Sequence, residues 1–175
     1  MSYEAETICN VYCRFARKDG QRMDSIRVEK LLYFTQGHSM SILGREIIKD
    51  DCECREYGVV FPTVRNTLVP QYGSGPIEEI HDAQKPWRFE PEGQLQDKDR
   101  ELLEACWGRY GREDTPSLMA MQCVADSPYK ILCNQGGDKH HQIIPKAMIR
   151  DYFCGIRKRN TADKPRPERP NDNVI

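Results

Sequence analysis

The sequence has no long apolar run and no excess of charge of one sign, and each absence argues against a class of protein. No segment approaches the roughly 20 apolar residues that a membrane-spanning helix needs. The formal net charge of −1 argues against a dedicated nucleic-acid-binding domain, which is usually clearly basic. The first residues, MSYEAETICNVYC, include acidic residues where a signal peptide would be basic. We therefore expect a cytoplasmic protein with no membrane partner and no nucleic-acid partner.

The motifs of common enzyme classes are also missing. The chain has no G-x-S-x-G nucleophile elbow, no phosphate-binding Walker A loop and no G-x-G-x-x-G. His38 is the histidine of most interest, because its predicted place near the end of a helix would favour the protonated form. No nucleophile and orienting partner stand next to it in the sequence, so a packing or hydrogen-bonding role is expected. The sequence therefore predicts a protein that is not an enzyme, with no catalytic residue and no cofactor.

Cysteine is abundant, with 8 residues, but its spacing does not predict a metal site. Candidate ligands fall into three groups: Cys9 with Cys13, Cys52 with Cys54, and Cys133 with His140 and His141. Structural zinc sites usually contain two C-x2-C or H-x3-H pairs, and these groups do not match that spacing. Cys9 and Cys13 lie beside apolar residues, where thiols pack as small hydrophobic groups. We expect reduced thiols and no bound metal.

Periodicity and turn residues predict a mainly α fold. Expected helices cover residues 4–17, 28–43, 97–110, 116–122 and 145–156, with a shorter helical piece between Pro62 and Pro70. Residues 71–93 are rich in glycine, proline and charge, and predict a loop with short strands at 77–80 and 87–89. Residues 157–175 have few apolar side chains and three prolines, which predicts a mobile tail. The fold class is thus a single compact helical domain, residues 1–156, with one or two short β segments and a flexible C-terminal tail.

The stretch from Val28 to Arg65 organises the chain. Its first half predicts an amphipathic helix, with a one-sided stripe of Val28, Leu31, Leu32 and Thr35. Asp24 or Ser25 can cap the start of this helix, and Gly44 can end it. The second half contains YGVVFP, in which valines and a phenylalanine favour extended backbone between a glycine and a helix-opening proline. A helix, a loop and a kinked apolar segment therefore form one compact unit.

The same stretch resembles the core of the Panacea antitoxin domain, a phage-associated family that includes the Soc-type antitoxin. The family's K-L-L-Y-F/Y-x-Q-G helix is matched by Lys30, Leu31, Leu32, Tyr33, Phe34, Gln36 and Gly37. Its E-A-W-x-Y-G-P-V-x-P segment is matched by Glu53, Tyr57, Gly58, Val60 and Pro62. The chain departs from that segment at Cys54, Arg55 and Val59, where the family usually has Ala, Trp and Pro.

The resemblance implies an antitoxin that neutralises a cognate toxin by direct protein–protein binding, in a type II-like toxin–antitoxin system. The Soc-type case also implies an adaptor that delivers the toxin to a cytoplasmic ATP-dependent protease. The alternative is a DNA-binding transcriptional regulator of phage or mobile-element origin, in which residues 97–110 and the helix after Thr115 form a helix-turn-helix. That alternative is weaker, because Ser117, Leu118 and Met119 are poor base-contacting residues.

The residues predicted to contact the partner lie in YGVVFP and on the preceding helix. They are Tyr57, Gly58, Val60, Phe61, Pro62 and Arg65, together with an exposed side of the Lys30–His38 helix that would carry Tyr33, Gln36 and His38. Val60 and Phe61 are also the residues in this set most suited to filling the core. Tyr57 and Arg65 are the better candidates for contact. The sequence predicts that Arg65→Glu abolishes neutralisation and leaves the melting temperature nearly unchanged.

Overall fold

A computed structural model describes residues 1–91, 93–134 and 141–162 of the chain. Its order of elements is α1 (Ala5–Lys18), α2 (Ser25–Ile42), β1 (Glu53–Arg55), β2 (Gly58–Val60), α3 (Pro62–Tyr72), α4 (Asp97–Tyr110), α5 (Thr115–Gln122), α6 (Pro128–Asn134) and α7 (Lys146–Ala162). The predicted mainly α fold with a short β segment is confirmed. No helix in the described parts of the chain is long and apolar enough to cross a membrane.

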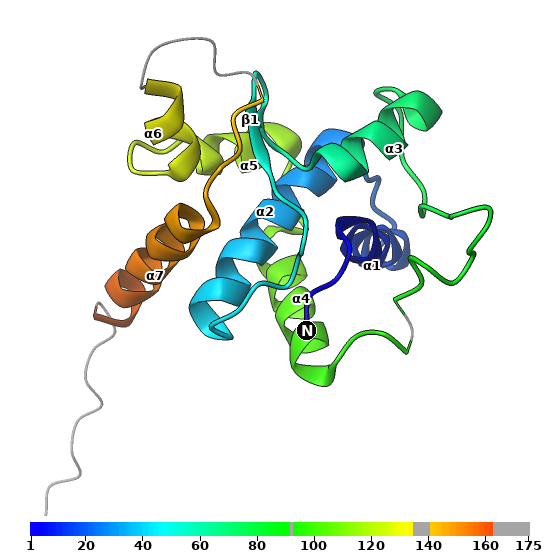
Figure 1. The fold of residues 1–175 in the computed structure, drawn as a ribbon, viewed down its shortest axis with the longest axis horizontal. Coiled ribbons are helices and arrows are strands. Elements are labelled where there is room, and N and C mark those ends of the chain that lie inside the picture. The colour runs from blue at the N-terminus through cyan, green and yellow to red at the C-terminus, as the bar shows by residue number, and fades with distance from the viewer. Residues whose placement is uncertain (92, 135–140, 163–175) are drawn as a thin grey trace, which may run out of the picture.

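Helix α2 runs through the middle of the molecule, and most other elements pack around it (Figure 1). Fifteen of its 18 residues are buried, so the predicted one-sided stripe is wrong. A stripe predicts one covered face, whereas α1, α3, α4, α5, α7 and β2 together cover α2 on all sides. The predicted cap is confirmed, because the Asp24 side chain accepts a hydrogen bond of 2.8 Å from the Arg27 backbone N–H.

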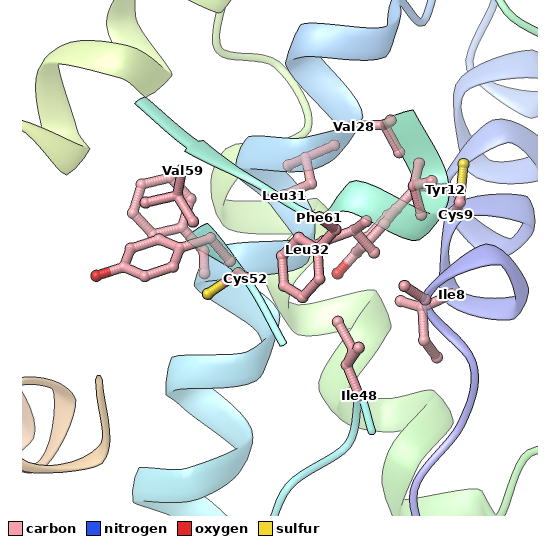
Figure 2. Close-up of a cluster of buried hydrophobic side chains, with 14 of the residues drawn as sticks. Ile8, Cys9, Tyr12, Val28, Leu31, Leu32, Ile48, Cys52, Val59 and Phe61 are labelled. Atoms are coloured by element: carbon pink, nitrogen blue, oxygen red, sulfur yellow. The ribbon is translucent and has the colours of Figure 1, made fainter. Parts of the chain in front are cut away.

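The core lies where α1, α2 and the segment from Ile48 to Phe61 meet (Figure 2). Ile8 and Tyr12 come from α1, and Leu31 and Leu32 come from α2. A second set of aromatic contacts joins α2 to α4 and α7. Its members are the stacked pair Phe34–Tyr110, with ring centroids 4.5 Å apart, and the edge-on pair Tyr33–Phe153 at 5.6 Å. The two sets together enclose the central helix.

The strands β1 and β2 form an antiparallel hairpin in which Arg55 pairs with Gly58 across a two-residue turn. Residues 141–144 lie along the other edge of β1. The Cys54 N–H donates to Gln142 O over 2.8 Å, and the Ile144 N–H donates to Cys52 O over 2.9 Å. This pairing joins segments about 90 residues apart, and no local pattern in the sequence indicated it.

Three local predictions are wrong. Pro70 does not end α3, which continues to Tyr72. Residues 77–80 and 87–89 are not strands. Residues 77–80 have no regular structure and are bound by side chains of α1, and 87–89 form turns. Helix α7 continues to Ala162, beyond the predicted boundary after residue 156. The Arg157 guanidinium donates to Ser41 O, which fixes this part of α7 to the end of α2. The remaining tail lies outside the described residues.

Candidate functional site

Gln36 is fully buried and holds the chain that follows α2 against that helix. Its Nε2 donates to Ile48 O over 2.8 Å, while its Oε1 accepts from the Ile47 and Ile48 N–H groups at 3.2 and 2.9 Å. A buried primary amide that both donates and accepts in this way satisfies backbone groups that no helix or sheet satisfies. Gln36 thus has a structural role, and it has no surface for a partner in this fold.

Tyr33 and Gly37 form the contact of α2 with α7. The Tyr33 side chain is 0% exposed, and burial raises the pKa of its hydroxyl well above the usual value. A Cβ placed on Gly37 would lie 2.2 Å from the Phe153 ring, so only glycine allows the two helices to approach this closely. The expected exposed side of the Lys30–His38 helix is therefore absent at these positions, because α7 covers it.

Lys30 and Gln122 occupy the outer edge of β2. The Lys30 ammonium donates to Val59 O over 2.9 Å, and Gln122 Oε1 accepts from the Val59 N–H at 3.2 Å. Both side chains are fully buried. Gly58 has φ +99°, and a Cβ there would lie 2.8 Å from Gln122 Oε1 and 3.0 Å from Lys30 Nζ. We call Lys30, Gln122 and Gly58 the hairpin lock. The Lys30 and Gln122 side chains take the place of a further strand beside β2, and Gly58 leaves the room that they need.

Glu29 adds a second buried charge next to the lock. Burial raises the pKa of its carboxyl to about 7, against the opposing effects of the Lys30, Arg65 and Arg55 charges. Burial also lowers the pKa of Lys30 to about 8, and the Glu29 charge opposes that shift. The shifts arise because removing either charge from water costs more than the mutual attraction returns. The nearest cation at the surface is Arg65, whose Nη1 lies 3.5 Å from Glu29 Oε2.

The outward side of the hairpin is fixed but exposed. Tyr57, in the turn, is 53% exposed. The Tyr129 hydroxyl of α6 donates to Arg55 O over 2.9 Å and holds the turn in place. The Arg55 guanidinium binds the Glu53 carboxylate and lies 2.9 Å from His141 Nε2. The structure thus presents the exposed Tyr57 side chain on a turn that hydrogen bonds of Tyr129 and Arg55 hold in place.

The family comparison agrees with this geometry. The model of the family described as "Antitoxin SocA-like, Panacea domain" matches residues 28–122, more than half of the chain. The chain belongs to this family. No curated protein and no solved structure gives a significant match.

Most of the Panacea residues matched in the sequence build the scaffold. Lys30, Gln36 and Gly58 make the contacts described above, and Val60 and Phe61 are buried, at 1% and 0% exposure. Pro62 opens α3 at its first turn and is partly exposed. The predicted partner residues therefore separate into a buried group and an accessible group. The accessible group is Tyr57, Pro62, Arg65 and, in part, His38.

His38 lies apart from the hairpin, at the junction of α2, α4 and α7. Its Nε2 shares a hydrogen bond of 2.7 Å with the Tyr110 hydroxyl, and its ring stacks on Tyr110 at 5.7 Å. Burial, with a smaller effect of the Arg109 charge, lowers the pKa of His38 to about 4. The expectation that the helix end favours protonation is wrong, since loss of solvent outweighs the partial charge of the helix. The neighbouring Tyr110 hydroxyl shares this hydrogen bond, and burial raises the pKa of Tyr110 to about 12, which favours its neutral form.

Within the described residues, no group of three or more His, Cys, Asp or Glu side chains is placed to hold a metal ion. Cys9, Cys13, Cys52 and Cys54 are all buried. Burial raises the pKa of Cys52 well above the usual thiol value, which keeps it protonated and unreactive. The side chains of Cys133 and His140 lie outside the described residues.

Sequence reasoning missed three buried polar side chains. Asn10 of α1 donates to Ile80 O and accepts from the Ile80 N–H, at 2.8 and 2.7 Å. Asp99 of α4 accepts from the Tyr3 hydroxyl at 2.7 Å. Glu29 is the third. Polar residues on helices are usually exposed, and no pattern in a single sequence marks these as exceptions.

Proposed function

We propose that this protein is the antitoxin of a toxin–antitoxin pair and acts in the cytoplasm by binding its cognate toxin directly. Membership of the SocA-like antitoxin family carries the proposal. The contact surface is the hairpin turn with Tyr57 and the outer face of α3, on which Arg65 lies. Tyrosine and arginine are the residue types most enriched among side chains that dominate binding energy.

The anchored hairpin suits this role. The hairpin lock binds the edge of β2 that faces away from β1, and Tyr129 of α6 binds the backbone next to the turn. A turn whose backbone is already fixed loses less conformational entropy when a partner binds. An interface of about 1,600 Å² in total is enough for stable association without any chemical step. The protein accordingly needs no catalytic residue to neutralise a toxin.

A growth assay tests the proposal. Expression of the gene adjacent to this one is expected to arrest growth, and co-expression of this protein is expected to restore it. Tyr57→Ser should abolish the rescue and weaken binding by about tenfold or more, because a buried aromatic anchor is lost from the interface. The free energy of unfolding should change by no more than about 0.5 kcal/mol, since Tyr57 is an exposed side chain.

Trp87→Ser is the matched control, because Trp87 is an aromatic residue that is 68% exposed on a different segment. It should rescue growth as the wild type does. Full rescue by Tyr57→Ser would exclude the hairpin turn as the contact. If the adjacent gene did not arrest growth, or if this protein did not bind its product, the antitoxin function itself would be rejected.

The structure changes what is expected of Arg65→Glu. A new carboxylate at this position would lie beside Glu29, whose side chain is 0% exposed. Two neighbouring carboxylates repel, and burial strengthens the repulsion. This variant should therefore lower the melting temperature, so it cannot separate binding from folding. A neutral substitution is the better test and is used below.

Two further possibilities from the sequence have different support. Delivery of the bound toxin to an ATP-dependent protease stays a prediction, and the half-life of the toxin with and without this protein tests it. DNA binding through α4 and α5 gains no support. Gln122, the residue of α5 best suited to contact a base, is 0% exposed and binds Val59.

A further inference from the structure

The charges around Glu29 leave one cation without a full partner. Lys30, which is completely buried, lies beside Glu29 and acts on its carboxylate more strongly than the two arginines do. Arg55 also acts on Glu29, but it is bound to Glu53 and His141. Among the described residues, Arg65 has one polar side-chain partner, Glu29 Oε2 at 3.5 Å. Most of the N–H donors of its guanidinium thus have no side-chain partner in the part of the chain that the structure describes, and 33% of the side chain is exposed.

Arg65 is flanked on α3 by uncharged residues, some of them apolar. Pro62, Arg65, Asn66 and Val69 follow the i, i+3, i+4, i+7 spacing of one helix face. Val69 is 40% exposed, whereas Val64 and Leu68 on the opposite face are fully buried. Helix α3 lies at the periphery of the molecule (Figure 1). Its exposed residues Asn66 and Val69 place this face at the surface, where another molecule can reach it. We call these four residues the α3 face.

We propose that the α3 face binds an acidic segment of the toxin, in which an aspartate or glutamate carboxylate pairs with Arg65 and an apolar neighbour packs on Val69. The inference rests on the proposed antitoxin function. The planar guanidinium can form two parallel hydrogen bonds to a carboxylate, which fixes both position and direction.

The composition of α3 favours a protein partner over a nucleic acid. Arg65 is the only charged residue between Pro62 and Tyr72. Binding to a nucleic-acid backbone uses several cations to neutralise successive phosphates. One arginine beside an exposed valine and proline instead matches the mixture of charge and apolar surface found at the centre of protein interfaces.

The test measures the affinity of the full chain for the purified product of the adjacent gene, at about 50 mM and about 300 mM salt. Arg65→Gln should weaken binding by about tenfold or more at low salt, and the difference from wild type should shrink at high salt. Arg65→Lys should retain part of the affinity, because it keeps the charge but not the planar fork. Arg100→Gln, which removes an exposed arginine from α4, is the matched control and should bind as wild type.

Glu29→Gln separates binding from folding. It removes the buried charge beside Arg65 but leaves the guanidinium on the α3 face, so affinity should stay within about twofold of wild type. Equal weakening by Glu29→Gln and Arg65→Gln would overturn the proposal, since Arg65 would then act only within the fold. The proposal would also be overturned if the Arg65→Gln and Arg100→Gln variants bound the toxin with equal affinity. If Arg65→Gln lost binding to duplex DNA and still bound the toxin, the ligand of Arg65 would be a DNA phosphate and not an acidic segment of the toxin. A wild type that does not bind the adjacent product would instead reject the antitoxin function.

Discussion

The side chains of Gln36 and Lys30 are buried, and their polar groups form hydrogen bonds with the backbone. Gln36 binds Ile47 and Ile48, which follow it by 11 and 12 positions, and Lys30 binds Val59, 29 positions away. A lysine in a helix is almost always at the surface, so the sequence alone predicts an exposed residue. The acceptor that permits burial becomes visible only when the hairpin is folded onto α2. This is why the contact role predicted for Gln36 fails while its match to the family pattern is correct.

His38 makes stability depend on pH. Its pKa is 6.5 in the unfolded chain and about 4 in the folded protein, so between these values the unfolded chain binds more protons. Stability contributed by neutral His38 is therefore present above pH 6.5 and is lost as pH falls towards 4. The loss should reach up to about 3 kcal/mol, from about 1.4 kcal/mol per pKa unit.

Denaturant unfolding at pH 7.5, 6 and 5 checks this dependence on His38. In His38→Gln, which keeps a hydrogen-bonding group near Tyr110 but does not titrate, the decrease with falling pH should be smaller. Carboxylates that titrate in the same range affect wild type and variant alike, so the difference between them isolates His38. Parallel pH profiles for the two proteins would show that His38 is not buried in its neutral form.

Among the elements, the hairpin shows how a strand edge can be closed by side chains. Val59 points its N–H and C=O away from β1, and Gln122 and Lys30 take the places of a neighbouring strand. An unsatisfied buried N–H costs about 1–3 kcal/mol. Gln122→Leu should therefore destabilise the protein by about that amount and speed amide hydrogen exchange at Val59.

Gln122→Glu is the informative comparison for this lock. Gln122 Nε2 is buried without a hydrogen-bond partner among the described residues. A glutamate keeps the acceptor for Val59 and replaces that unsatisfied donor with an oxygen near the Lys30 ammonium. Gln122→Glu should accordingly be more stable than Gln122→Leu at pH 7, as judged by melting temperature. The reverse order would mean that apolar packing, not the hydrogen bond to Val59, is the main contribution of this residue.

Several helices with clear local sequence signals were predicted well, whereas pairing between distant segments was not. The bounds of α4, residues 97–110, are as predicted, because the apolar spacing of Leu103, Cys106 and Tyr110 is sufficient to define it. The start of α3 at Pro62 is also correct. Pairing of residues 141–144 with β1 has no local signal, since it is decided by the folded positions of two distant segments. At the candidate site, Gly58 was enough to place Tyr57 on a turn. The hydrogen bond from Tyr129 to the backbone next to that turn could not be predicted from the sequence.

At the scale of the whole molecule, the segment matched by the family does not enclose its own core. Residues 28–122 begin inside α2, after the Asp24 cap, and end with Gln122, before α6 and α7. Helix α1 covers one side of α2, and α7 covers another. Phe153 of α7 packs against both Tyr33 and Phe34. Residues outside the matched segment therefore complete the fold that presents Tyr57 and Arg65.

It follows that residues 28–122 should not fold when produced alone. Without α1 and α7, the fragment exposes Leu32, Tyr33 and Phe34, each at most 5% exposed in the whole protein, and a chain of that size cannot offset its ordering entropy without them. We expect a narrow range of amide proton shifts and no cooperative thermal transition. Residues 1–162, which keep every described element, are the control and should unfold cooperatively and rescue growth. A well-dispersed amide proton spectrum from the 28–122 fragment would contradict this. It would show that the buried residues of α2 can pack within the fragment and that the core is complete without α1 and α7.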